Sequence, residues 1–313
     1  MKMQKPRLPQ RAQRSDRRRT FVLASIIAGS LLVTILIAHW IDSHRASPDL
    51  QVEEEGLYLA GNTLRRASLG FNGLSADWYW MRSLQYVGHK FLNAKTNIQL
   101  DDLSQLNLNL LAPLLDITTT LDPEFEEPYE YAAAVLPAID VQEAIRIIRK
   151  GIAANPAAWR LYQHLGYIYW QRRDFQAASE AYGQGAKLPG APHWMEAMKA
   201  RMAAEGGSRN LAREIYGRMY DQAGDTSVKE MARRRLLQLD SWDQRDELRK
   251  VLSAYKSKAG RCPSSWKEIE SLSRALGLPV DSTGAPLDPA GTAYVLVKGN
   301  CEVDLDLKSM VPK

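Results

Sequence analysis

A unit of about 34 residues recurs along the middle of this chain, and this recurrence constrains the fold more than any other feature. Three alanines, Ala144, Ala178 and Ala212, follow each other at intervals of 34 residues. Each has a very small residue twelve positions before it and a bulky residue four positions after it. The small residues are Ala132, Gly166 and Ala200, and the bulky residues are Ile148, Tyr182 and Tyr216. Small residues let neighbouring helices approach closely, so the pattern predicts stacked antiparallel helical hairpins.

The copy at 159–192 is the sharpest and resembles the tetratricopeptide repeat. Its matching positions are Tyr162, Leu165, Gly166 and Tyr169 in the first helix, Asp174 and Phe175 in the turn, and Ala178 and Tyr182 in the second helix. It departs from that family at Gly185 and Gly190, where alanine and proline are preferred. The copies at 125–158 and from 193 match less completely, and Pro137 interrupts the first helix of the former. Residues 78–87 and 110–121 suggest an earlier unit.

An uncharged apolar stretch at 21–41 precedes the repeats. At about 1.5 Å per residue, a helix of this length crosses a hydrocarbon layer about 30 Å thick. Eight basic residues and one acid, Asp16, come before it, and such an excess of basic residues keeps a flanking segment cytoplasmic. The sequence therefore predicts a single-pass membrane protein with its N-terminus in the cytoplasm; in a bacterial inner membrane, the bulk of the chain then lies in the periplasm.

A cleaved export signal is the alternative interpretation of the same stretch, because Arg18-Arg19-Thr20-Phe21 resembles a twin-arginine signal. Its apolar length exceeds that of an ordinary signal peptide, and residues 38–40 offer no small-residue cleavage site. Removing the first 19 residues takes away eight of the 41 basic and one of the 36 acidic residues, which leaves 33 and 35. The basic balance of the chain thus belongs to its tail, and we expect no nucleic-acid partner.

The last third of the chain changes character after a long helical segment. Residues 227–258 lack Pro and Gly and predict one long helix or two in line, capped by Asp225 or Ser227 and ended by Gly260. Beyond it, a short helix and a hairpin formed by 293–298 and 301–307 are expected. This C-terminal part resembles secretion-system pseudopilins over about 45 residues. Its two cysteines, Cys262 and Cys301, predict one disulfide in an oxidising compartment, with two unpaired buried thiols as the alternative.

Few residues in the sequence point to catalysis. The histidines are scattered without metal-ligand spacing, and we find no phosphate loop, nucleophile elbow or cysteine beside a base. Adjacent acids such as Asp101-Asp102 point apart on a helix. We therefore expect no enzyme, no cofactor and no metal.

Tetratricopeptide geometry implies a concave surface that is lined by the first helix of each repeat. Carried over position by position, the lining residues are Glu126, Tyr129, Ala133, Arg160, Gln163, Tyr167, Trp170, Gln171, Trp194, Ala197 and Arg201. This set is aromatic with arginines, which is the composition of protein-binding hot spots. The alternative for Trp170 and Trp194 is packing between helices, and the cluster at 78–80 is also expected to be core packing.

The fold class expected is mainly α: a transmembrane helix, a tetratricopeptide-like α-solenoid and a small C-terminal α+β module. The expected ranges are a basic tail at 1–20, the span at 21–41, a linker at 42–56, the repeats at 57–258 and the module at 259–313. As a whole the chain is similar to membrane-anchored bacterial repeat proteins. That similarity implies a scaffold that binds protein or peptide partners of an envelope or secretion complex. The alternatives are a component of a type II secretion or type IV pilus machine and a small-molecule-binding or enzymatic protein.

Overall fold

The computed structural model describes residues 10–44, 61–94, 103–297 and 299–313, and these residues are mainly helical. The chain divides into two compact units, Met1–Leu59 and Ala60–Lys313. Most of the linker expected at 42–56 lies outside the described residues.

The first unit contains helix α1, Gln10–His44. Its segment Val22–Trp40 has the length and apolar composition needed to cross a membrane, and no other helix among the described residues does. The helix begins at Gln10, well before the apolar stretch, whereas we expected a separate tail at 1–20. The reason is local, because no Pro or Gly occurs between Gln10 and the apolar stretch and the arginines there are good helix formers. Residues 1–9 lie outside the described residues.

The second unit begins with α3, Gly61–Ala67, α4, Asn72–Leu92, the 3-10 turn η1, Ser104–Leu106, and α5, Leu111–Leu121. Both α3 and α4 pack against α5. On the buried face of α4, Ala76 and Tyr79 contact Leu114, Ile117 and Leu121 of α5 in one apolar cluster. The two segments suggested by the sequence as an earlier unit therefore form a packed helical pair.

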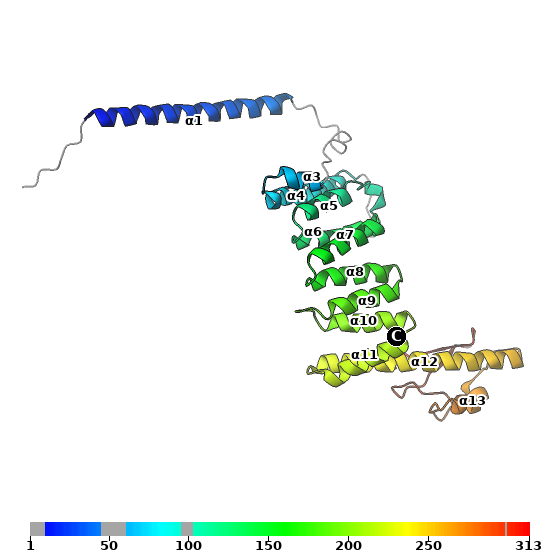
Figure 1. The fold of residues 1–313 in the computed structure, drawn as a ribbon. Helices are drawn as coiled ribbons and strands as arrows, with labels where there is room; N and C mark the ends of the chain where they lie inside the picture. The colour runs from blue at the N-terminus through cyan, green and yellow to red at the C-terminus, as the bar shows by residue number, and fades with distance from the viewer. Residues whose placement is uncertain (1–9, 45–60, 95–102, 298) are drawn as a thin grey trace, which may run out of the picture. The chain divides into compact units, whose positions relative to one another are not determined.

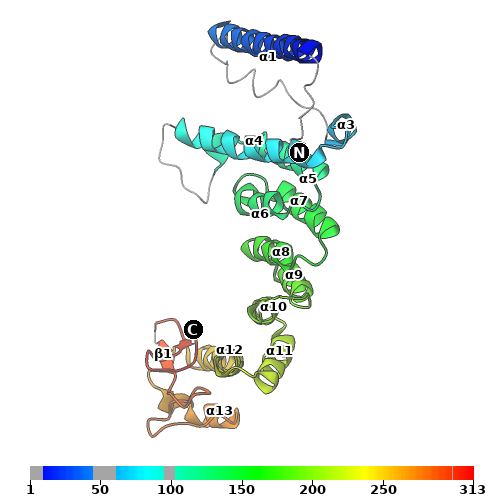
Figure 2. The same cartoon turned by 90° about the vertical axis from the view of Figure 1, so that its left-hand side faces the viewer.

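Three further pairs of helices follow in chain order (Figure 1). They are α6, Glu126–Val135, with η2, Leu136–Ala138, and α7, Val141–Ala154; α8, Trp159–Gln171, with α9, Phe175–Gly185; and α10, Trp194–Glu205, with α11, Arg209–Gln222. From α4 to α12, each α-helix packs against the next, and α6 also packs against α8 (Figure 2). Helix α6 ends just before Pro137, as expected.

The repeated positions are packing positions. Ala144, Ala178 and Ala212 have no exposed surface, and the small and bulky residues in register with them are buried as well. The repetition extends to the helix caps, because Asp140 and Asp174, also 34 residues apart, accept hydrogen bonds from amides in the first turns of α7 and α9. Each cap satisfies amides that have no partner within the helix.

Helix α12, Thr226–Ala259, is one continuous helix. Asp225 caps it by accepting a hydrogen bond from the amide of Ser227, and Gly260 ends it with φ +70°, a left-handed conformation that suits glycine. Both ends were predicted. Its first half covers the α10–α11 pair, where Ala232 and Leu239 are buried.

The second half of α12 belongs to another core. Leu248 and Leu252 are fully buried with Trp266, Tyr294 and Val303 of the C-terminal segment. This segment contains η3, Trp266–Ile269, α13, Glu270–Ala275, and strands β1, Val295–Val297, and β2, Glu302–Asp304, paired antiparallel. The strands are shorter than the sequence suggested. The module expected at 259–313 therefore shares its core with the end of α12.

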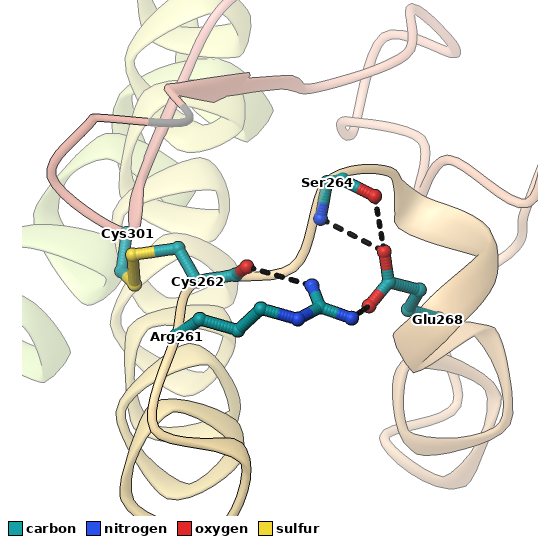
Figure 3. The surroundings of a disulfide bond; sticks show 5 residues. All are labelled: Arg261, Cys262, Ser264, Glu268 and Cys301. Carbon is teal, nitrogen blue, oxygen red and sulfur yellow. Dashed lines mark hydrogen bonds and ion pairs between the residues drawn. A yellow bond between two sulfur atoms is a disulfide. The ribbon is translucent and has the colours of Figure 1, made fainter.

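Cys262 and Cys301 form the predicted disulfide, which joins the loop after α12 to the residue before β2 (Figure 3). Beside it, Glu268 of η3 accepts hydrogen bonds from the amide and hydroxyl of Ser264 and pairs with Arg261 at 2.9 Å. Tyr255 of α12 donates a further hydrogen bond to the same carboxylate. These bonds lower the pKa of Glu268 to about 2, with the Ser264 hydroxyl as the largest cause.

Candidate protein-binding surface

Two tryptophans join the N-terminal ends of α8 and α10. The rings of Trp159 and Trp194 meet edge to face with their centroids 6.2 Å apart. The guanidinium of Arg160 lies 4.9 Å from the centroid of the Trp159 ring. Trp194 remains 43% exposed, so part of its surface is available to another molecule.

A second aromatic group joins the two helices nearer their C-terminal ends. Tyr167 and Trp170 of α8 pack edge to face at 5.9 Å, and Arg201 of α10 lies 4.8 Å over the Trp170 ring. Arg201 also pairs with Glu205 at 2.7 Å, and Gln171 donates a hydrogen bond to the Tyr167 hydroxyl. Tyr167 is 46% exposed, whereas Trp170 is half-buried against the α9–α10 core. We call Arg160, Tyr167, Trp170, Trp194 and Arg201 together the α8–α10 surface.

The adjoining pocket between α6 and α8 is acidic. Its volume is about 430 Å³, and it is lined by Glu124, Glu126, Glu127, Glu130 and Arg160. The positive charge of Arg160 therefore shares this pocket with several carboxylates. Gln163, one helical turn beyond Arg160, is half-buried. At this edge of the α8–α10 surface, the electrostatic field favours a neutral or positively charged group.

Two residues assigned to the groove from tetratricopeptide geometry lie in the core instead. Tyr129 has no exposed surface, and its hydroxyl donates to the carbonyl oxygen of Pro123 at 3.2 Å. Burial raises the pKa of Tyr129 to about 12. Tyr129 can be buried here because Gly151 of α7 has no side chain. A Cβ at Gly151 would lie 2.8 Å from the Tyr129 ring. The ring thus occupies the space left by the glycine, and Ala133 beside it is 5% exposed.

Trp78 is placed opposite to expectation. We expected the Trp78-Tyr79-Trp80 cluster to be core packing, and Tyr79 is buried while Trp80 packs edge to face with Phe125 and Tyr131. Trp78, however, is 51% exposed. Successive residues on a helix differ by about 100° in direction, so three tryptophan or tyrosine side chains in a row cannot all face one core.

A cavity of about 440 Å³ that the sequence did not predict lies beside the second half of α12. It is lined by Phe175, Ala204, Glu205, Arg209, Trp242, Arg245, Asp246 and Arg249. Arg209 pairs with Asp243 at 2.7 Å and with Asp246 at 2.6 Å, and Arg249 pairs with Glu302 at 2.9 Å. Carboxylates thus already neutralise these guanidinium groups. The alternation of Arg and Asp along α12 was the available signal.

Metal ligands and similarity to known proteins give no information about what these surfaces bind. Among the residues described, no three His, Cys, Asp or Glu side chains gather as metal ligands would. No protein-family model matches the chain, and no curated protein matches it. The binding role of the α8–α10 surface therefore depends on the exposure and contacts of its own side chains.

Proposed function

We propose that this protein is a membrane-anchored scaffold of the bacterial inner membrane. In this proposal, α1 spans the membrane with its N-terminus in the cytoplasm. The paired helices form a tetratricopeptide-like α-solenoid in the periplasm. Its role is to hold a polypeptide partner of an envelope or secretion complex close to the membrane. The basic residues before the apolar stretch support this orientation, and the disulfide between Cys262 and Cys301 is typical of an oxidising compartment.

The observation that carries the binding role is the exposure of aromatic rings held by neighbouring helices. Tyr167 and Trp194 are nearly half exposed although each contacts another aromatic ring. Rings that are fixed in this way lose little conformational entropy when a partner covers them. Trp, Tyr and Arg are the residues that contribute most to protein interfaces. A partner with apolar anchors that cover Tyr167 and Trp194 fits this surface.

The charge beside these rings narrows the class of partner. The acidic pocket between α6 and α8 lies next to Arg160, whose own neighbour Trp159 contacts Trp194. A polypeptide that covers Trp194 and extends toward α6 therefore meets mainly carboxylates. We infer that its basic residues lie on the α6 side and its apolar residues over α8 and α10.

Alanine variants of the exposed rings test this binding role. Tyr167→Ala and Trp194→Ala are expected to remove the polypeptides that copurify with the full chain from solubilised native membranes. Trp78→Ala is the matched control, because it removes an exposed ring from α4, outside the α8–α10 surface. Circular dichroism and thermal melting establish that the variants remain folded. Unchanged recovery of the same polypeptides with both variants would reject the α8–α10 surface as the interface.

A reporter fused after Lys313 tests the orientation separately. A periplasm-specific reporter such as alkaline phosphatase is expected to be active, because the basic tail retains the N-terminus in the cytoplasm. Activity of a cytoplasm-specific reporter in the same fusion would reverse the topology. That result would also remove the oxidising compartment that supports the disulfide.

A further inference from the structure

Helix α4 is apolar on two opposite faces. Its buried face, with Ala76, Tyr79, Ser83 and Val87, packs on the rest of the unit. Leu74, Trp78 and Met81 follow at intervals of four and three residues, which places them together on the other face. A helix that is apolar all round is normally covered on all sides. Among the residues that the structure describes, none covers this second face of α4.

The exposure of this second face is large. Leu74, Trp78 and Met81 are each more than half exposed, and so are Phe71, at the start of the helix, and Leu92, at its end. We call these five residues the α4 outer face. Four of them lie at the start and in the first half of the helix and Leu92 is its last residue, and the helix lies at the N-terminal end of the second unit (Figure 2). Isolated exposed apolar side chains are ordinary, but four of them within the eleven positions from Phe71 to Met81 mark an interaction site.

The segment that contains α3 and α4 is basic. Between Gly61 and Leu92 the chain carries Arg65, Arg66, Arg82 and Lys90 but one acid, Asp77. Arg65 and Arg66 are exposed in the last turn of α3, and the guanidinium of Arg82 lies 5.3 Å over the Trp78 ring. Tryptophan beside apolar side chains and cations is the composition of helices that lie in the headgroup region of a bilayer. Anionic lipids attract such basic residues.

The position of α4 in the chain brings it near a membrane if α1 is inserted. Residues 41–60, twenty positions, separate the apolar segment that ends at Trp40 from α3. Helix α1 continues to His44, so sixteen of these residues connect the two helices, and sixteen residues span at most about 58 Å when fully extended. A surface held on so short a connection meets the bilayer at a high effective concentration, so even a weak affinity keeps it there.

We propose that the α4 outer face lies on an anionic lipid surface and docks the helical unit against the membrane. This inference rests on the proposed membrane anchoring by α1. It concerns a surface separate from the α8–α10 surface. Trp78, Leu74 and Met81 would enter the headgroup region, and the arginines of α3 and α4 would contact lipid phosphates.

The test uses the full chain with a protease site inserted within 45–60. The protein is reconstituted into vesicles, inserted α1 is verified by resistance to carbonate extraction, and the connection is then cleaved. After flotation, the released unit is expected to remain with vesicles that contain the anionic lipid phosphatidylglycerol. It is expected to leave vesicles of phosphatidylcholine alone, and raised salt should release it from the anionic vesicles, because screening weakens the attraction.

Variants identify the contact. The triple variant Leu74→Ser, Trp78→Ser, Met81→Ser loses three apolar contacts with lipid. We expect retention of its released unit on anionic vesicles to fall at least about tenfold. Tyr167→Ser with Trp194→Ser removes exposed rings from the other surface and is expected to leave retention unchanged. In the full chain, brominated lipids should quench a component of tryptophan fluorescence that disappears in Trp78→Phe and persists in Trp194→Phe.

Each remaining outcome overturns the proposal. Equal release from anionic and neutral vesicles, or equal retention of the triple variant, would remove the lipid surface as the occupant. A released unit that is dimeric in solution, and monomeric when Trp78 is replaced by Ser, would assign the α4 outer face to a second copy of the chain. Failure of α1 to insert before cleavage would instead reject the anchoring on which both proposals depend.

Discussion

Gly166 of α8 lies directly against the aromatic ring of Tyr182 in α9. A Cβ on Gly166 would be 2.8 Å from both Cδ2 and Cε2 of that ring, which is closer than atoms can pack. Tyr182 is 2% exposed, and its burial raises the pKa of its hydroxyl to about 12. The missing side chain of Gly166 therefore sets the distance between the two helices of this pair.

Adding one methyl group at Gly166 should destabilise the protein. We expect Gly166→Ala to lower the free energy of unfolding by about 1–2 kcal/mol, because the cost of overpacking exceeds the gain in helix propensity. Chemical denaturation measures the change. Gly217→Ala in α11 is the matched control, since a Cβ added there would meet no neighbouring atom within 4 Å. The control is expected to stabilise by about 0.5–1 kcal/mol, and the same sign for both variants would contradict the assigned contact.

Trp170 and Tyr167 are one helical turn apart but should differ in their contribution to stability. Trp170 is half-buried against the core of α9 and α10, so Trp170→Ala is expected to cost about 2–3 kcal/mol. Tyr167 is 46% exposed, and Tyr167→Ala is expected to cost less than about 1 kcal/mol. Thermal melting of the two variants measures this difference. Equal losses would place both rings in the same environment.

Glu268 should make the stability of the C-terminal segment depend on pH in the acidic range. Its pKa is lowered to about 2 by hydrogen bonds, of which the bond from the Ser264 hydroxyl has the largest effect. The folded state therefore binds this proton more weakly than the unfolded chain, whose value is 4.5. The stabilisation is complete above pH 4.5 and is lost as the pH falls toward 2.

We expect wild type to exceed Glu268→Gln in its urea midpoint at about pH 6 and the difference to shrink as the pH approaches about 2. Glu214→Gln removes a largely exposed carboxylate whose ion pair is 3.8 Å long, and it serves as the control. Parallel pH profiles for wild type and Glu268→Gln would show that the carboxylate has no such role.

The disulfide should contribute strongly to the C-terminal core. Cys262 and Cys301 are 39 residues apart in the chain, and closing a loop of this size stabilises by about 4 kcal/mol in the chain-entropy picture. Cys262→Ser with Cys301→Ser is expected to lose most of that stability, measured by denaturation of the segment around Trp266. A reducing agent should lower the wild-type midpoint and leave the double variant unchanged. A wild-type midpoint insensitive to reduction would contradict this contribution.

Several elements could be predicted from the sequence because local rules determine them. The positions of Ala144, Ala178 and Ala212 showed which helix faces are buried, and the structure confirms this. Asp225 and Gly260 marked both ends of α12, since a capping side chain and a left-handed glycine act within one helical turn. The disulfide pairing followed from there being two cysteines in the chain.

Tertiary structure decided the features that depend on contacts between segments. Tyr129 is buried because Gly151, 22 positions later, leaves room for its ring, and helix periodicity contains no information about that space. The second half of α12 enters the C-terminal core because residues near 266, 294 and 303 fold back onto Leu248 and Leu252. Trp78 faces outward because Ala76 and Tyr79 occupy the side of α4 against α5. A sequence shows which residues are apolar, but only the packing of one helix on another determines which of its apolar faces is covered.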